Sequence, residues 1–162
     1  MYWRLTAAEY NQLKGEGNRK AFKKLLGKTT PGILAYSDGV PAGWCAIAPR
    51  EQYKRLENSK VLKPVDEKKV WSVSCFFIHR QFRKKGLSVP LLFAAVNFAI
   101  GQGAAIVEGY PIDPATGPGG KSKKNIPAAF AWTGLTGTFS LAGFKEVARR
   151  SETRPIMRFI KK

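Results

Sequence analysis

The sequence VWSVSCFFIHRQFRKKGLSVPLL, residues 70–92, decides the fold. Its opening part, Val70–Ile78, is apolar, β-branched and aromatic, contains neither Pro nor Gly, and therefore predicts a buried strand. A basic turn follows, and a helix is expected to begin near Ser88. A strand, turn and helix in this order direct several free backbone N–H groups at one point, where the helix N-terminus adds about half a positive charge. The stretch therefore predicts a binding site for phosphate groups.

The turn between strand and helix has the composition of a pyrophosphate cradle. Its basic side chains supply full positive charge, and Gly86 lets the backbone approach a ligand without a Cβ in the way. The alternative is an ordinary strand–turn–helix unit whose basic turn is solvated. The residues expected to hold the phosphates are Arg83, Lys84, Lys85, Gly86, Leu87 and Ser88.

Length and composition limit the classes of protein to consider. The 162 residues fit one domain, 1–162, without an internal repeat or a linker. No apolar run approaches the roughly 20 residues that span a bilayer, so no membrane association is expected. Cys45 and Cys75 lack metal-ligand spacing, which favours reduced thiols in a cytoplasmic protein and no metal site. Cys75 as an acyl-accepting nucleophile is an alternative, although no partner base is evident.

Charge is the other bulk property. The chain has 28 Lys and Arg against 11 Asp and Glu, a formal net charge of +17. Such a chain attracts polyanions without a dedicated site, so the charge is compatible with nucleic acid, an acidic substrate or coenzyme A. No RNA- or DNA-binding motif is present, and no specific nucleic-acid partner is expected.

The rest of the chain predicts an α/β domain with a mixed central sheet. Helices are expected over 6–26, in one or two pieces, and over 51–58, 88–101 and 128–142. Residues 32–36 and 42–48 predict an antiparallel hairpin, and 104–110 a strand parallel to 70–78 through a right-handed crossover. Residues 144–148 and 156–160 predict a final antiparallel pair. The Pro-, Gly- and Lys-rich segment 111–127 is expected to be irregular and mobile.

The turn Arg83-Lys84-Lys85-Gly86-Leu87-Ser88 resembles the Arg/Gln-x-x-Gly-x-Gly/Ala signature of the GCN5-related N-acetyltransferase (GNAT) superfamily, with Ser88 at the last position. The later strand, the helix ending in Ala142-Gly143-Phe144 and the final strand pair follow that family's order. The resemblance implies the acyl-CoA N-acyltransferase fold and acetyl-CoA as cosubstrate. It also implies that backbone N–H groups of Phe76, Phe77 and Ile78 polarise the thioester carbonyl and hold the pantetheine arm.

Catalytic residues are suggested by the same resemblance. The two parallel strands are expected to splay apart, so that Glu108 and Tyr110 face the cleft or its rim. Glu108 is the candidate general base, and its alternative role is a carboxylate that neutralises the basic surface. The family's usual general acid, a Tyr, aligns with Phe139, and a common Asn aligns with Trp132. Tyr110 or Ser140 would then replace the acid, or the thiolate leaves unassisted. The only histidine, His79, is interpreted as a strand-end residue.

The front of the chain departs from the resemblance. The superfamily begins with a strand beside the first hairpin, whereas Met1-Tyr2-Trp3-Arg4 leads almost directly into a helix. The chain is therefore expected to be truncated at its start and to expose one sheet edge, through which a homodimer would form. The function expected is acetyl transfer from acetyl-CoA to an amine, on a small molecule or a peptide. The alternative is a coenzyme-binding or nucleic-acid-binding module with little or no catalysis.

Overall fold

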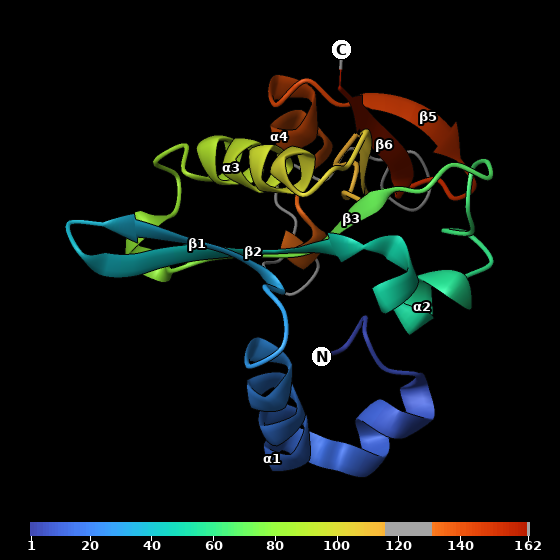
Figure 1. Cartoon of the computed structure of the whole chain (residues 1–162). Helices are drawn as coiled ribbons and strands as arrows, with labels where there is room; N and C mark the ends of the chain where they lie inside the picture. The colour runs from blue at the N-terminus through green and yellow to red at the C-terminus, as the bar shows by residue number, and fades with distance from the viewer. Residues whose placement is uncertain (116–130, 162) are drawn as a thin grey trace.

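A six-stranded mixed sheet forms the centre of the protein (Figure 1). The structure is a computed structural model that describes residues 1–115 and 131–161. The strands lie in the order β1-β2-β3-β4-β6-β5. Their bounds are β1 Gly32–Ser37, β2 Val40–Pro49, β3 Trp71–Ile78, β4 Ile106–Gly109, β5 Lys145–Arg149 and β6 Pro155–Ile160. The mixed α/β fold expected from the sequence is confirmed, as are the hairpin and the final antiparallel pair.

The junction between β3 and β4 is the parallel contact of the sheet. The pairing runs from Trp71 opposite Val107 to Val73 opposite Gly109, and β3 continues to Ile78 without this neighbour. The other neighbouring strands pair in antiparallel orientation. The sheet therefore opens between β3 and β4 at the end of β3, close to the basic turn.

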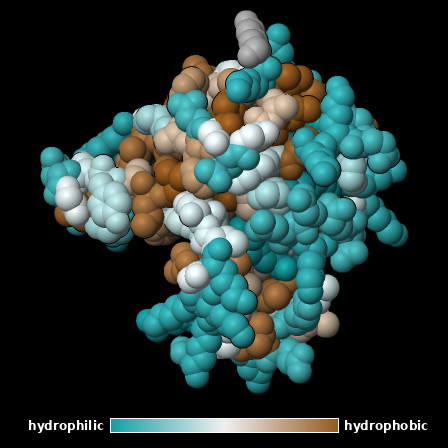
Figure 2. All heavy atoms as spheres, in the orientation of Figure 1, coloured by the Kyte–Doolittle hydropathy of each residue, from teal (hydrophilic) through white to brown (hydrophobic). Residues whose placement is uncertain are grey.

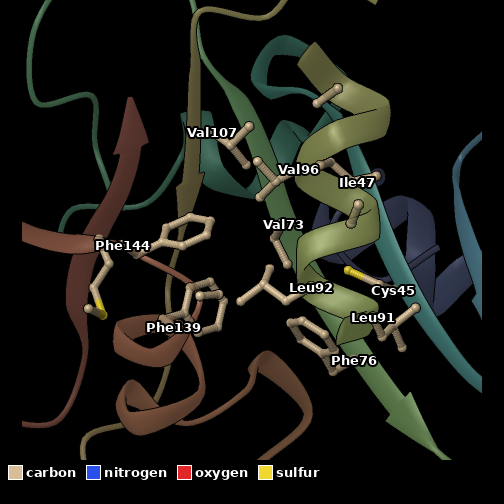
Figure 3. Close-up of a cluster of buried hydrophobic side chains, with 14 of the residues drawn as sticks. Cys45, Ile47, Val73, Phe76, Leu91, Leu92, Val96, Val107, Phe139 and Phe144 are labelled. Carbon is tan, nitrogen blue, oxygen red and sulfur yellow. The ribbon is translucent and has the colours of Figure 1, made fainter. Parts of the chain in front are cut away.

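Helices cover both faces of the sheet. One face carries α3 Ser88–Gly101 and α4 Thr136–Leu141, and the other carries α1 Ala7–Leu26, α2 Lys54–Glu57 and the N-terminal segment (Figure 1). Short 3-10 helices lie at Arg50–Gln52, Arg80–Phe82 and Ala131–Thr133. The main core lies under α3, where Leu92 points towards Val73 and Phe139 (Figure 3). Figure 2 shows hydrophilic side chains over α1 and α2 and more hydrophobic ones around α3 and α4.

The first helix starts as its sequence predicts. The Thr6 side chain accepts from the Glu9 amide at 3.2 Å, and the Glu9 carboxylate accepts from the Thr6 amide at 2.7 Å. These reciprocal bonds form a capping box, which satisfies two N–H groups at the start of the helix. The helix is interrupted at Lys14, whose φ of 51° and ψ of −164° are not helical. The expected division into two pieces is therefore present, just before the Gly15–Asn18 stretch.

The expected helix over 128–142 is wrong in its extent. The structure has a 3-10 helix at Ala131–Thr133 and then α4 at Thr136–Leu141, with Gly134 at φ +86° between them. Residues 128–130 lie outside the described part of the chain, as do residues 116–127 of the segment expected to be irregular. The described beginning of that segment is held by hydrogen bonds, from the Ile112 amide to the Gly134 carbonyl and from the Asp113 amide to the Thr153 carbonyl.

Strand β1 forms one edge of the sheet as far as the described residues show. Leu34 and Tyr36 on this strand are exposed. A homodimer through this edge stays a prediction. In the described part of the chain, no helix combines the length and apolar character needed to cross a membrane.

Candidate functional site

The basic turn leads into the longest helix on its face of the sheet. Residues Lys84 and Gly86 have positive φ angles of 61° and 75°, and α3 begins at Ser88 and continues to Gly101. A Cβ built on Gly86 meets no atom within 4 Å, so the space beside its backbone is open. The turn thus combines a left-handed bend, nearby cations and the amide end of a 14-residue helix. Such an arrangement can bind phosphate groups.

The end of β3 carries two backbone N–H groups that point to the open side of the sheet. Amides along a strand alternate between its two edges. The His79 amide donates to the Ala42 carbonyl at 2.9 Å, and Phe77 lies opposite Trp44, so the amides of Phe77 and His79 face β2. Those of Phe76 and Ile78 face the edge from which β4 has diverged. Among the described residues no strand pairs with β3 on this edge beyond Val73.

This alternation corrects one expectation from the sequence. Phe77 was expected to offer its amide to a thioester together with Phe76 and Ile78, but its N–H group is turned towards the neighbouring strand. The side chain of Phe77 is instead half exposed on the surface. The Ile78 carbonyl, which shares the open edge, accepts a hydrogen bond from Arg83 Nε at 2.9 Å. Arg83 therefore ties the basic turn to the end of β3.

A cavity of about 180 Å³ lies beside β2 and β3, and residues of the N-terminal segment and α1 contribute to its lining. Its floor includes Ser74 and Cys75, which directly precede Phe76 on β3. Its walls are mostly aromatic and come from distant parts of the sequence. They include the segment Met1–Arg4 and the side chains of Phe22, Trp44, Tyr53 and Trp132. The arrangement can hold a small apolar molecule beside the end of β3.

Glu108 and Tyr110 occupy a closed ionic network instead of a cleft, which corrects their expected exposure. Both side chains are 0% exposed. Glu108 accepts from Arg158 Nε at 2.7 Å and from Arg50 at 3.2 Å, and the Tyr110 hydroxyl donates to Glu108 at 2.8 Å. The two residues share one face of the sheet, as their spacing predicts, but α2 and the segment after it cover that face.

The network leaves Tyr110 poorly suited to donate a proton. Burial, and then the neighbouring Glu108 carboxylate, raise the pKa of the Tyr110 hydroxyl well above its ordinary value. The hydroxyl also accepts hydrogen bonds from Arg50 at 2.7 Å and from Ser72 at 2.8 Å. Arg50 in turn donates to the carbonyls of Leu56 and Leu62. Every group in this network is committed to another, so the arrangement stabilises the fold around α2.

The structure also shows the surroundings of the other residues considered for catalysis. Phe139 is buried, with its ring packed edge-on against Phe76 and Phe144, and against Gly109, where a Cβ would collide with it. Ser140 is exposed on α4. Burial raises the pKa of the Cys75 thiol, which keeps it protonated and weakens it as a nucleophile. His79 stacks near Phe82 at the end of β3.

The sequence and the fold were compared with known proteins. Residues 2–110 match the acetyltransferase (GNAT) family. The chain belongs to this family. The match spans the basic turn, β3 and β4, so the resemblance read from the turn is confirmed. No curated protein matches the sequence.

Solved GNAT structures share the fold at low sequence identity. An acetyltransferase of the GNAT family from Streptococcus agalactiae is 14% identical with a TM-score of 0.55, over 95% of this chain and 80% of that chain. A ribosomal-protein-alanine N-acetyltransferase from Brucella melitensis is 13% identical with a TM-score of 0.54, over 90% and 78%. An aminoglycoside acetyltransferase in complex with coenzyme A is 16% identical with a TM-score of 0.52, over 80% and 65%. At these identities the likeness concerns the fold alone.

Sequence reasoning missed the residues of the aromatic cavity. The sequence predicts only that Met1–Arg4 leads into the first helix, whereas this segment lines the cavity together with residues of β2 and β3. Trp132 was considered only as a departure from a family Asn. A signal was present in the composition, because three of the four tryptophans of this chain line the same cavity. Their convergence depends on the tertiary fold and has no local pattern.

Proposed function

We propose that this protein transfers an acetyl group from acetyl-CoA to an amine, with Arg83–Ser88 as the cradle for the pyrophosphate. The observation that supports the proposal most is the opening of the sheet after Val73 and Gly109, beside the N-terminus of α3. The open edge and the helix start lie on the same strand–turn–helix unit. A pantetheine arm in that opening would connect the cradle to the aromatic cavity on the other face.

The mechanism we infer depends on positioning. The amides of Phe76 and Ile78 would donate hydrogen bonds to the thioester carbonyl and favour the negative charge that develops there. An amine in the apolar cavity is poorly solvated, which lowers the pKa of its ammonium form and favours the neutral nucleophile. The thiol of coenzyme A has an ordinary pKa near 8.5, so its thiolate leaves without an acid in the place of Phe139 and takes up the proton that the amine nitrogen loses as the amide forms. The remaining rate acceleration comes from holding the thioester and the amine in contact and correctly oriented.

Glu108 and Tyr110 have no place in this mechanism. A carboxylate bound by two arginines and closed off from solvent cannot collect a proton from an entering amine. The alternative function remains a coenzyme-binding or nucleic-acid-binding module without catalysis, and the loss of the family's usual tyrosine at Phe139 favours it. A homodimer through the exposed edge of β1 is a further proposal, independent of the chemistry.

Calorimetric titration with acetyl-CoA tests the cradle. Gly86→Asp places a carboxylate in the open space beside the turn, where like charges about 4 Å apart repel by about 4 kcal/mol, or about a thousandfold in affinity. We therefore expect acetyl-CoA affinity to fall by at least about 100-fold. Gly39→Asp is the matched control, since Gly39 also has a positive φ, 76°, and open space around its Cβ position.

The two variants carry the same change of charge and a similar backbone strain. If a folded Gly86→Asp variant binds acetyl-CoA as tightly as Gly39→Asp does, the cradle is wrongly assigned. Release of free thiol on addition of amines then separates the two functions. Tight binding of acetyl-CoA without acetylation of any amine in a broad collection would favour the binding module.

A further inference from the structure

Three side chains that line the aromatic cavity carry buried hydrogen-bond donors without an acceptor. They are Trp3 through Nε1, Arg4 through one terminal nitrogen, and Tyr53 through its hydroxyl. None of these atoms makes a hydrogen bond of ordinary geometry with another described residue, although the Ser74 side chain lies close enough to the Tyr53 hydroxyl to oppose the rise in its pKa that burial causes. An unsatisfied buried polar group costs about 1–3 kcal/mol, and more when it is charged. Their shared position on one small cavity indicates a ligand with acceptor oxygens.

Arg4 is held so that its remaining nitrogen is available to such a ligand. One terminal nitrogen donates to Gln52 Oε1 at 2.6 Å, and the guanidinium stacks over the Tyr53 ring at 4.8 Å. Within residues 1–115 and 131–161, no carboxylate forms an ion pair with Arg4. A fixed and partly buried guanidinium without a counterion favours a carboxylate, which accepts charge-assisted hydrogen bonds.

Tyr53 supplies a neutral donor to the same cavity. Its side chain is 1% exposed, and burial raises the pKa of its hydroxyl to about 12, with Arg4 and Ser74 acting in the opposite direction. The hydroxyl therefore keeps its proton at physiological pH and can donate it to an oxygen. The indole N–H of Trp3 is a donor only. The three groups offer N–H and O–H donors and Arg4 adds a positive charge, so together they suit an anion.

We propose that the cavity binds the carboxylate of a small amino-acid-like acceptor through Arg4, Tyr53 and Trp3. The acceptor's apolar side chain then packs against the aromatic wall that includes Phe22, Trp44 and Trp132. This substrate class rests on the proposed acetyl transfer, because the acceptor's amine would lie near Ser74 and Cys75, next to the Phe76 amide. Because the three donor atoms are buried in this structure, binding of the carboxylate requires the side chains around them to move.

The size of the cavity and the net charge of the protein favour small amino-acid-like acceptors over other amines. A cavity of about 150 Å³ holds one benzene ring, so about 180 Å³ is enough space for a single ring or a branched chain. The formal net charge of +17 repels polycationic amines and attracts acceptors that carry a carboxylate. Both properties favour an acceptor that is a small amine with a negatively charged group.

Matched ligands give the test. L-phenylalanine and L-leucine are compared with their amides, which keep the amine and the side chain and lose the carboxylate charge, and with phenethylamine. Binding is followed by tryptophan fluorescence, because three of the four tryptophans line the cavity. A charge-assisted hydrogen bond contributes about 1.5–3 kcal/mol, so we expect at least one free acid to bind about 10- to 100-fold more tightly than its amide.

Two arginine variants test whether the Arg4 side chain causes the preference for the free acid over the amide. Arg4→Gln should reduce the ratio of free-acid to amide affinity to about one, since the carboxylate loses its charged partner. Arg19→Gln removes the same charge from an exposed position on α1 outside the cavity and should leave the ratio unchanged. The ratio is measured within one variant and does not depend on how much of that variant is folded.

The outcomes separate this inference from the proposed function. Equal affinity for the acids, the amides and phenethylamine, or no binding of either acid at millimolar concentration, overturns the inference. If acetyl is also transferred to phenethylamine and the amides as readily as to the acids, the proposed acetyltransferase activity is supported and the proposed acceptor class is wrong. A preference for the acids that disappears in Arg4→Gln, without acetylation of any amine, supports the site and contradicts the enzyme.

Discussion

The role of Glu108 that the sequence suggests differs from the role that the structure shows. A lone Glu at the end of a parallel strand suggests a base, since cleft carboxylates often act in that way. Its arginine partners, Arg50 and Arg158, are distant in the sequence and join it only when the sheet and the segment after β2 are assembled. Ionised carboxylates are buried only when they are paired and hydrogen-bonded. The pairing therefore identifies Glu108 as a structural residue.

The first residue-scale prediction concerns stability. Glu108→Gln leaves Arg50 and Arg158 buried without their shared carboxylate, and removing one partner of a buried ion pair costs about 3–5 kcal/mol in the free energy of unfolding. Urea denaturation should therefore show a large loss, whereas acetyl transfer per folded molecule should stay within about twofold. The transfer rate is compared at a temperature where both proteins are folded.

Glu57 provides the control for this variant. It also pairs with Arg50, at 2.9 Å, but its side chain is 47% exposed. Exposed ion pairs contribute about 0–1 kcal/mol, so Glu57→Gln should change the free energy of unfolding by less than about 1 kcal/mol. A Glu108→Gln variant that matches Glu57→Gln in stability but has lost acetyl transfer would return Glu108 to the role of general base.

The strand and helix on either side of the basic turn were predictable because their signal is local. A basic, Gly-containing turn between a strand and a helix is visible within residues 70–92, and the structure places α3 at Ser88 as expected. The direction of the Phe77 amide was not predictable, because it depends on which residue of β2 lies opposite. The donors on Trp3, Arg4 and Tyr53 were not predictable either, since they meet only in the folded chain.

At the scale of elements, periodicity and caps predicted most of the fold. Runs of apolar residues identified the strands, and the crossover through α3 made β3 and β4 parallel. The helix expected over 128–142 failed where Gly134 takes a φ of +86°, because a left-handed residue ends a helix. The short ladder between β3 and β4 was predicted only as a splay, since strand divergence depends on what packs between the strands, including Phe139 beside Gly109.

The start of α1 supports a prediction on pH. The Glu9 carboxylate accepts from Lys54 Nζ at 2.6 Å and from the Thr6 amide, and these contacts lower its pKa from 4.5 to about 2. A carboxyl with a lowered pKa in the folded state stabilises the fold above its unfolded pKa and loses that contribution as pH falls towards about 2. We expect wild type to melt at a higher temperature than Glu9→Gln at pH 6.

The same comparison at lower pH completes the test. The difference in melting temperature between wild type and Glu9→Gln should shrink as pH falls below about 4.5 and should vanish near pH 2, where Glu9 itself becomes neutral. Glu16 lies further along α1, is exposed and forms no ion pair within the part of the chain that the structure describes, so Glu16→Gln serves as the control. A difference in melting temperature that stays constant over this pH range would contradict the role of the Glu9 charge.

For the whole molecule, the excess of positive charge is the dominant property. Six of the 11 acidic residues form ion pairs with cations in the described structure, namely Glu9, Glu57, Asp66, Glu108, Asp113 and Glu146. Much of the acidic charge is therefore engaged locally, and the surplus of Lys and Arg produces a field over the rest of the surface. That field would attract coenzyme A and the proposed carboxylate acceptor alike, because both are anions.

The last prediction tests whether this field has a second, nucleic-acid function. A diffuse field binds duplex DNA through phosphate neutralisation alone, and affinity then falls about 10³–10⁵-fold between about 50 and 200 mM salt when 6–10 phosphates are contacted. We expect fluorescence anisotropy with two unrelated duplexes to show weak, equal binding at low salt and none near 200 mM. Acetyl-CoA binding should persist at the higher salt, since its phosphates are held by directed amides of the cradle. Tight binding near 200 mM that distinguishes the two duplexes would instead require base contacts, and would make nucleic acid a specific partner of this chain.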